Sequence, residues 1–99
     1  MIIVLCQLAV STGERDHYLE SKRAQIDATR HEAGCLDYRF VLDADDSSKV
    51  SIIERWDSMA AFQAHLAALS PDAASGGPVD SRVVDVSIYE AHPTEVPQG

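Results

Sequence analysis

Hydrophobic and polar residues alternate along this 99-residue chain in a pattern that predicts four strands and two helices. Residues 1–10 are a nearly continuous apolar run, which is typical of a strand covered on both faces. Residues 14–33 contain neither Gly nor Pro, and we expect them to form a helix capped by Ser11 or Thr12. Its thin apolar face, Leu19, Ile26 and Ala33, predicts a helix that lies on a sheet with most of its surface in water.

The second half of the pattern predicts a hairpin, a short helix and a last strand. Residues 36–42 alternate with period two, residues 43–48 have turn composition, and residues 50–56 return as a strand. Asp57 or Ser58 is expected to cap a helix that Ser70-Pro71 ends. Residues 70–81 are a predicted loop, residues 83–90 a strand and residues 93–99 a tail.

This order of elements predicts an α+β protein with the ferredoxin-like βαββαβ fold. Right-handed crossovers then give a four-stranded antiparallel sheet with both helices on one face. We expect a single domain over residues 1–92 and a C-terminal tail over residues 93–99. The opposite sheet face would be bare, and Ile2, Val4 and Leu8 make the first strand apolar on both faces. A homodimer through this bare face is therefore predicted.

Composition excludes several classes of partner. The formal net charge is −8, and the basic residues are scattered, so neither a nucleic acid nor an anionic membrane is an expected partner. Residues 1–10 are too few to span a bilayer. Cys6 and Cys35 have no metal-ligand spacing and indicate a reduced, cytoplasmic protein, in which Cys35 acts as a small buried hydrophobe.

Side chains that can carry chemistry converge on one predicted cavity. Alternation places Tyr38 on the helix-facing side of its strand, and Glu54 and Trp56 together on the next strand. Phe62 and His65 share one face of the second helix. Gln7, on a face with Ile3, Leu5 and Ala9, is expected to add one polar group. The resulting cleft, apolar with a few convergent polar groups, has the form of a small-molecule site.

Each of these residues also has a purely structural interpretation. His65 is either a satisfied core histidine or an acid or base of the pocket. Glu54 is either paired with an arginine, for which Arg39, Arg55 and Arg82 are candidates, or kept for proton transfer. Trp56 and Tyr38 either pack in the core or form a wall against a ligand.

The motif Glu32-x-Gly34-Cys35-x-x-Tyr38, followed by Glu54-x-Trp56 and then His65, resembles the antibiotic biosynthesis monooxygenase family. The resemblance implies a dimeric α+β barrel and cofactor-independent oxygenation of a small phenolic or quinol-type aromatic, without a metal. A base would remove a phenolic proton, and the electron-rich anion would react with dioxygen. The implied catalytic residues are His65 and Glu54. The implied substrate-binding residues are Tyr38, Trp56, Phe62 and Gln7.

Other functions remain open at this level. A non-catalytic, dimeric small-molecule-binding or stress-associated module needs the same cavity. Haem-degrading relatives have an iron-ligating His where this chain has Ser75. Relatives that isomerise a small phosphorylated sugar need basic residues near the pocket, and the sequence predicts few there.

Overall fold

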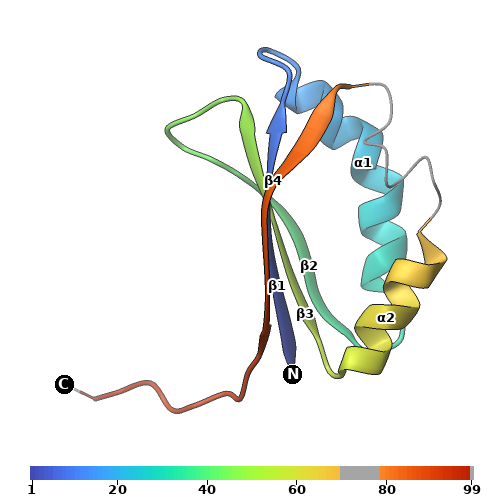
Figure 1. Ribbon diagram of the computed structural model, residues 1–99, viewed down its shortest axis with the longest axis vertical. Coiled ribbons are helices and arrows are strands. Elements are labelled where there is room, and N and C mark those ends of the chain that lie inside the picture. Colours follow the sequence, from blue (N-terminus) through green and yellow to red (C-terminus); the bar gives the residue numbers. More distant parts are fainter. Residues whose placement is uncertain (70–78, 99) are drawn as a thin grey trace.

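The computed structural model describes residues 1–69 and 79–98, which form four strands and two helices. In chain order these are β1 (Ile2–Val10), α1 (Arg15–Arg30), β2 (Cys35–Leu42), β3 (Lys49–Trp56), α2 (Met59–Ala68) and β4 (Ser81–Glu90). The strand order is β2-β3-β1-β4, and all neighbouring pairs are antiparallel. Both helices cover the same face of the sheet (Figure 1). The predicted ferredoxin-like α+β fold is confirmed.

The start of α1 and the start of β4 differ from the sequence-based expectation, whereas the cap of α2 agrees with it. Neither Ser11 nor Thr12 caps α1: Glu14 holds the N-cap position, and its side chain makes no capping hydrogen bond. Ser58 caps α2, because its Oγ accepts a hydrogen bond from the amide of Ala61 at 3.1 Å. β4 begins at Ser81, and the rest of the predicted 70–81 loop, with Ser70-Pro71, lies almost entirely outside the described residues. After β4, residues 91–98 run away from the sheet on the side opposite the helices (Figure 1).

A tight turn at Gly34 joins α1 to β2 and brings α2 against it. Gly34 has a φ of 82°, which only glycine adopts without strain. A Cβ at this position would lie 2.5 Å from both the Cβ of Ala61 and Oδ1 of Asp57. The turn therefore requires glycine for its backbone conformation and for the close approach of α2.

The core lies between the sheet and the helices, and it fixes which face of β1 is covered. Ile2, Val4, Leu8 and Val10 are buried on the helix side. The expectation that Ile2, Val4 and Leu8 supply the bare face is therefore wrong. Because β1 is apolar on both faces, its alternation does not tell which face the helices cover.

The helix layer leaves β4 largely uncovered. Val83, Val86 and Ile88 are each between 48% and 59% exposed, although Val86 and Ile88 pair with Cys6 and Val4 of the covered sheet region. In the described parts of the chain, neither helix has the length and apolar character needed to cross a membrane.

Candidate functional site

A cavity of about 330 Å³ lies between the sheet and the two helices. Tyr38, Glu54, Phe62 and His65, four of the five residues expected to surround it from the strands and α2, line its wall. Apolar side chains from all four strands and both helices make up most of the remaining wall. A volume of this size and a mostly apolar wall are typical of a small-molecule site.

His65 lies between two carboxylates at one end of this cavity. Its side chain is 2% exposed, and its Nδ1 is 3.0 Å from Oε2 and 3.3 Å from Oε1 of Glu32. Its Nε2 is 3.9 Å from Oε1 of Glu54. With Glu32 accepting the Nδ1 proton, the lone pair of Nε2 is left for a group in the cavity. This arrangement is the one required of a general base.

Glu54 is held by Trp56 rather than by an arginine. The indole Nε1 of Trp56 donates a hydrogen bond to Oε1 of Glu54 at 3.0 Å, in the interior. Arg39 and Arg55 instead pair with Asp37, at 2.7 and 3.6 Å. Burial raises the pKa of the Glu54 carboxyl above its usual value. The hydrogen bond from Trp56 and the charge of His65 lower this pKa, but they do not offset the effect of burial. The prediction of an arginine partner from β2 or β3 is therefore wrong.

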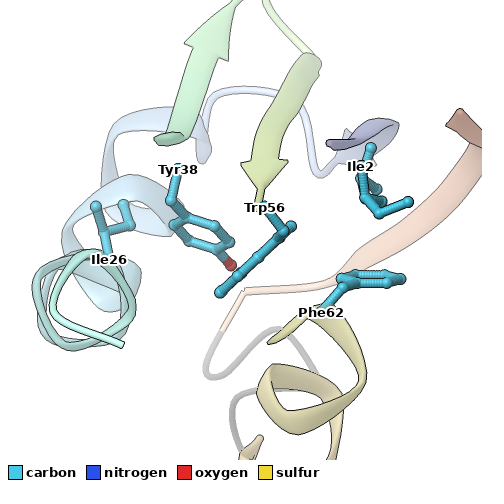
Figure 2. Close-up of a cluster of buried hydrophobic side chains, with 6 residues drawn as sticks. Ile2, Ile26, Tyr38, Trp56 and Phe62 are labelled. Atoms are coloured by element: carbon cyan, nitrogen blue, oxygen red, sulfur yellow. The ribbon is translucent and has the colours of Figure 1, made fainter. Parts of the chain in front are cut away.

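Trp56 lies behind the cavity wall and not on it. It is fully buried, and its ring centroid is 4.8 Å from that of His65 and 6.3 Å from that of Phe62. Figure 2 shows its indole between the side chains of Tyr38 and Phe62. The expectation that Trp56 contacts a ligand directly is corrected: its ring packs against His65, and its N–H orients Glu54.

Tyr38 presents a ring and a fixed hydroxyl. The hydroxyl accepts a hydrogen bond from Nε2 of Gln25 on α1 at 2.9 Å, and the ring meets His65 edge-on with centroids 5.5 Å apart. Burial raises the pKa of this phenol most, and the negative charge of Glu54 raises it further. Tyr38 is therefore neutral at physiological pH and can position a ligand without titrating.

The family to which this architecture belongs is shown by comparison with known proteins. The model of the family described as antibiotic biosynthesis monooxygenase matches residues 1–72, more than half of the chain. The chain belongs to the antibiotic biosynthesis monooxygenase family. No curated protein sequence matches it.

Solved structures agree with this assignment. A proposed antibiotic biosynthesis monooxygenase from Deinococcus radiodurans is 28% identical over 100% of both chains, with a TM-score of 0.79. A conserved protein from Methanosarcina mazei is 19% identical over 92% of both chains, with a TM-score of 0.75. A proposed antibiotic biosynthesis monooxygenase from Chloroflexus aurantiacus is 20% identical over 96% of both chains, with a TM-score of 0.74. The last two share the fold.

One expected member of the antibiotic biosynthesis monooxygenase site lies elsewhere. Gln7 pairs with Ser51 and Asp85, and with Leu5 and Ile53 it lines a shallow groove on the uncovered sheet face. Side chains alternate along a strand, and Ile2, Val4 and Leu8 face the helices. Gln7 therefore faces the opposite side of the sheet. Its predicted place in the cavity is wrong.

Two site residues were not predicted from the sequence. Glu32 is part of the family motif, but its contact with His65 depends on the turn at Gly34 and on the docking of α2. Lys22 is 3% exposed and lines the cavity, although the sequence predicts a helix with most of its surface in water. Its spacing from Tyr18 and Ile26, four residues on either side, was the available signal, because these three residues share one buried helix face.

The cysteines of this family member offer no nucleophile at neutral pH. Burial raises the pKa of both thiols, and neighbouring carboxylates raise it further. Over residues 1–69 and 79–98, no three His, Cys, Asp or Glu side chains are grouped in a way that would hold a metal ion.

Proposed function

We propose that this protein is a cofactor-independent monooxygenase that oxidises a small phenolic or quinol-type aromatic in the cavity between sheet and helices. The observation that carries the proposal is the position of His65, which is buried at the cavity wall with Glu32 on Nδ1 and Glu54 near Nε2. Membership of the antibiotic biosynthesis monooxygenase family supports the same chemistry.

The proposed reaction draws its electrons from the substrate. A phenol with a free para carbon reacts with one dioxygen to give a quinone and one water, so that the substrate loses four electrons and dioxygen gains them. Nε2 of His65 accepts the phenolic proton, and the resulting phenolate passes an electron to dioxygen. The two radicals combine at the para carbon to form a hydroperoxide. Loss of the proton on that carbon and departure of water then form the second carbonyl.

The neighbouring residues stabilise the charge that this proton transfer creates. The imidazolium formed at His65 lies between the carboxylates of Glu32 and Glu54 in an enclosed site, where electrostatic interactions are strong. Tyr38 and Phe62 hold the substrate ring against the wall on either side of His65. Trp56 acts indirectly, because it orients Glu54 through its N–H.

An oxygen electrode and product spectra test the proposal with a panel of quinols and naphthols. We expect dioxygen consumption and quinone formation in equal amounts, unchanged by a metal chelator and in protein that shows no flavin absorbance. His65→Ala should lower turnover about 10²-fold while the protein stays folded. His17→Ala is the control, because His17 is exposed on α1 and does not line the cavity. Flat traces, or equal rates for wild type and His65→Ala, would favour a small-molecule-binding module.

The proposed assembly is a cytoplasmic homodimer through the uncovered sheet face. Leu5 and Tyr89 are 43% and 51% exposed there, and a chain of 99 residues gains stability when such a surface is covered. Sedimentation at micromolar concentration should give a dimer. Leu5→Lys should give a folded monomer, whereas Met59→Lys, at an exposed position in the first turn of α2, should stay dimeric. A monomeric wild type would contradict this assembly.

A further inference from the structure

Gln25 brings an unsatisfied polar atom to the wall of the cavity. Its side chain lines the cavity from α1, and its Nε2 donates a hydrogen bond to the Tyr38 hydroxyl at 2.9 Å. Its Oε1 is buried and has no hydrogen-bond partner among the described residues. Neither of the two cations that line the cavity, Lys22 and Arg82, donates to this oxygen. Because a buried acceptor without a donor is rare and costly, its presence beside a cavity indicates a place for a group of the ligand.

The Tyr38 hydroxyl next to this amide has a proton to donate. It accepts the hydrogen bond from Gln25, and none of the described residues accepts one from it. Because burial raises the pKa of this phenol, the proton stays on its oxygen at physiological pH. Figure 2 shows Tyr38 reaching from β2 toward the helices. Since Oε1 and Nε2 of Gln25 belong to one amide group, the two residues present an acceptor and a donor next to each other.

We propose that Gln25 and Tyr38 bind a second hydroxyl group of the substrate, so that the substrate is a dihydroxylated aromatic with one hydroxyl at His65 and the other at Gln25. This inference rests on the proposed function only for the hydroxyl at His65. A hydroxyl both donates and accepts. It donates to Oε1 of Gln25 and accepts from the Tyr38 hydroxyl, which already accepts from Nε2 of Gln25. Each polar group of the pair then has a partner, and Gln25 determines specificity while His65 removes the proton.

The chemistry of this pair rejects groups that carry no proton. A carbonyl, an ether or a fluorine at the same position leaves Oε1 of Gln25 without a donor. A site built to hydrogen-bond a hydroxyl discriminates against an analogue that lacks it, because buried polar groups are then left unpaired. Water also donates and accepts, so a substrate hydroxyl replaces a water at this position. The net preference for a hydroxyl is therefore smaller than the full cost of an unpaired acceptor.

Calorimetric binding without dioxygen tests the inference separately from turnover. The probes are 1,6-dihydroxynaphthalene and 6-fluoro-1-naphthol, which share the ring system, the first hydroxyl and the free carbon para to it. Fluorine is close to a hydroxyl in size but has no proton to donate. For the wild type we expect the Kd of the diol to be about 10-fold lower than that of the fluoro compound.

Two matched variants assign this preference to one residue. Gln25→Met keeps the length of the side chain and removes the amide, so it should abolish the preference for the diol. Gln63→Met makes the same change at an exposed position on α2 that does not line the cavity, and it should leave the preference unchanged. The wild-type comparison of the two probes decides the inference even where Gln25→Met fails to fold.

Three outcomes would overturn the inference: equal wild-type affinity for the two probes, a preference that survives Gln25→Met, or no binding of either probe to the wild type. Oxygen uptake decides the proposed function independently. If the diol binds in a Gln25-dependent way and no dioxygen is consumed, the oxygenase proposal fails and the hydroxyl site stands. If both probes are oxidised with the same kcat/KM in wild type and in Gln25→Met, the oxygenase proposal stands and the hydroxyl site fails.

Discussion

Glu32 and His65 are 33 residues apart in the sequence, yet the Glu32 carboxylate accepts a hydrogen bond from Nδ1 of His65 at 3.0 Å. The His65 ring is almost completely buried, whereas the Glu32 side chain is 30% exposed. Glu32 therefore fixes the tautomer of His65 from the solvent side and leaves Nε2 for the cavity.

Removing Glu32 should release this tautomer. In the wild type, the nitrogen NMR signals of neutral His65 should show the proton on Nδ1, and Glu32→Ala should move most of it to Nε2. Turnover should fall about 10²-fold in Glu32→Ala and less in Glu32→Gln, which keeps an acceptor. The exposed pair of His17 and Glu14, 3.2 Å apart, is the matched control. If Glu14→Ala and Glu32→Ala have the same small effect on turnover, Glu32 does not position the base.

Replacing Glu54 should change stability in a pH-dependent way. Its folded-state pKa is raised above 4.5, so the stability that it contributes is fully present below that pH and is lost as the pH rises through the folded pKa. Glu54→Gln keeps the acceptor for Trp56 and does not ionise. Its melting temperature should exceed that of the wild type by about 5 °C at pH 8, equivalent to ~1 kcal/mol, and match it at pH 4.

Circular dichroism melts at pH 4, 6 and 8 check this prediction. Glu20→Gln, at an exposed position on α1, is the control for a general charge effect. A constant difference between Glu54→Gln and wild type across the pH range would mean that burial does not control the ionisation of Glu54.

Tyr38→Phe separates positioning from proton transfer. The variant removes the hydroxyl that accepts from Gln25 at 2.9 Å, and Oε1 of Gln25 already lacks a hydrogen-bond donor among the described residues. The free energy of unfolding should fall by about 1 kcal/mol, measured by urea denaturation. Because the phenol of Tyr38 stays neutral at physiological pH, KM should rise while kcat stays within about 3-fold of wild type. A large loss of kcat with unchanged KM would assign the hydroxyl a chemical role.

Gly13 and Gly34, both with positive φ, provide a controlled test of the turn beside Glu32. Gly13 and Gly34 have φ values of 80° and 82°, yet a Cβ at Gly13 would meet nothing within 4 Å. Gly13→Ala should therefore cost only the backbone strain, about 1 kcal/mol. Gly34→Ala should cost at least about 3 kcal/mol, because α2 must also move away. Thermal unfolding that ranks the two variants equally would show that α2 tolerates the extra methyl group.

The pattern of the sequence was sufficient for the fold and for part of the site. Period-two alternation placed Tyr38 and Glu54 correctly, and the two residues pair directly across β2 and β3. Alternation failed on β1, where both faces are apolar, and Gln7 was assigned to the wrong side for that reason. Alternation also tells which face of the sheet a side chain is on, but not whether other side chains cover it. It therefore does not show that Trp56 lies behind the cavity wall.

The remaining site residues depend on tertiary structure. The charge of a lysine is usually solvated, so the sequence does not single out Lys22, and the packing of α1 over the sheet encloses it. The contact of Glu32 with His65 arises between a turn and a helix that are far apart in the sequence, so no local pattern encodes it.

The hydrogen bond from Trp56 to Glu54 gives the protein an internal optical reporter. Trp56 is the only tryptophan in the chain, and it touches both ionisable members of the proposed centre: its N–H bonds Glu54, and its ring lies 4.8 Å from that of His65. A protonated imidazole quenches indole emission, and the charge on a bonded carboxylate shifts its wavelength. Fluorescence of the unlabelled protein therefore follows the protonation state of the buried centre directly, without substrate, turnover or an added dye.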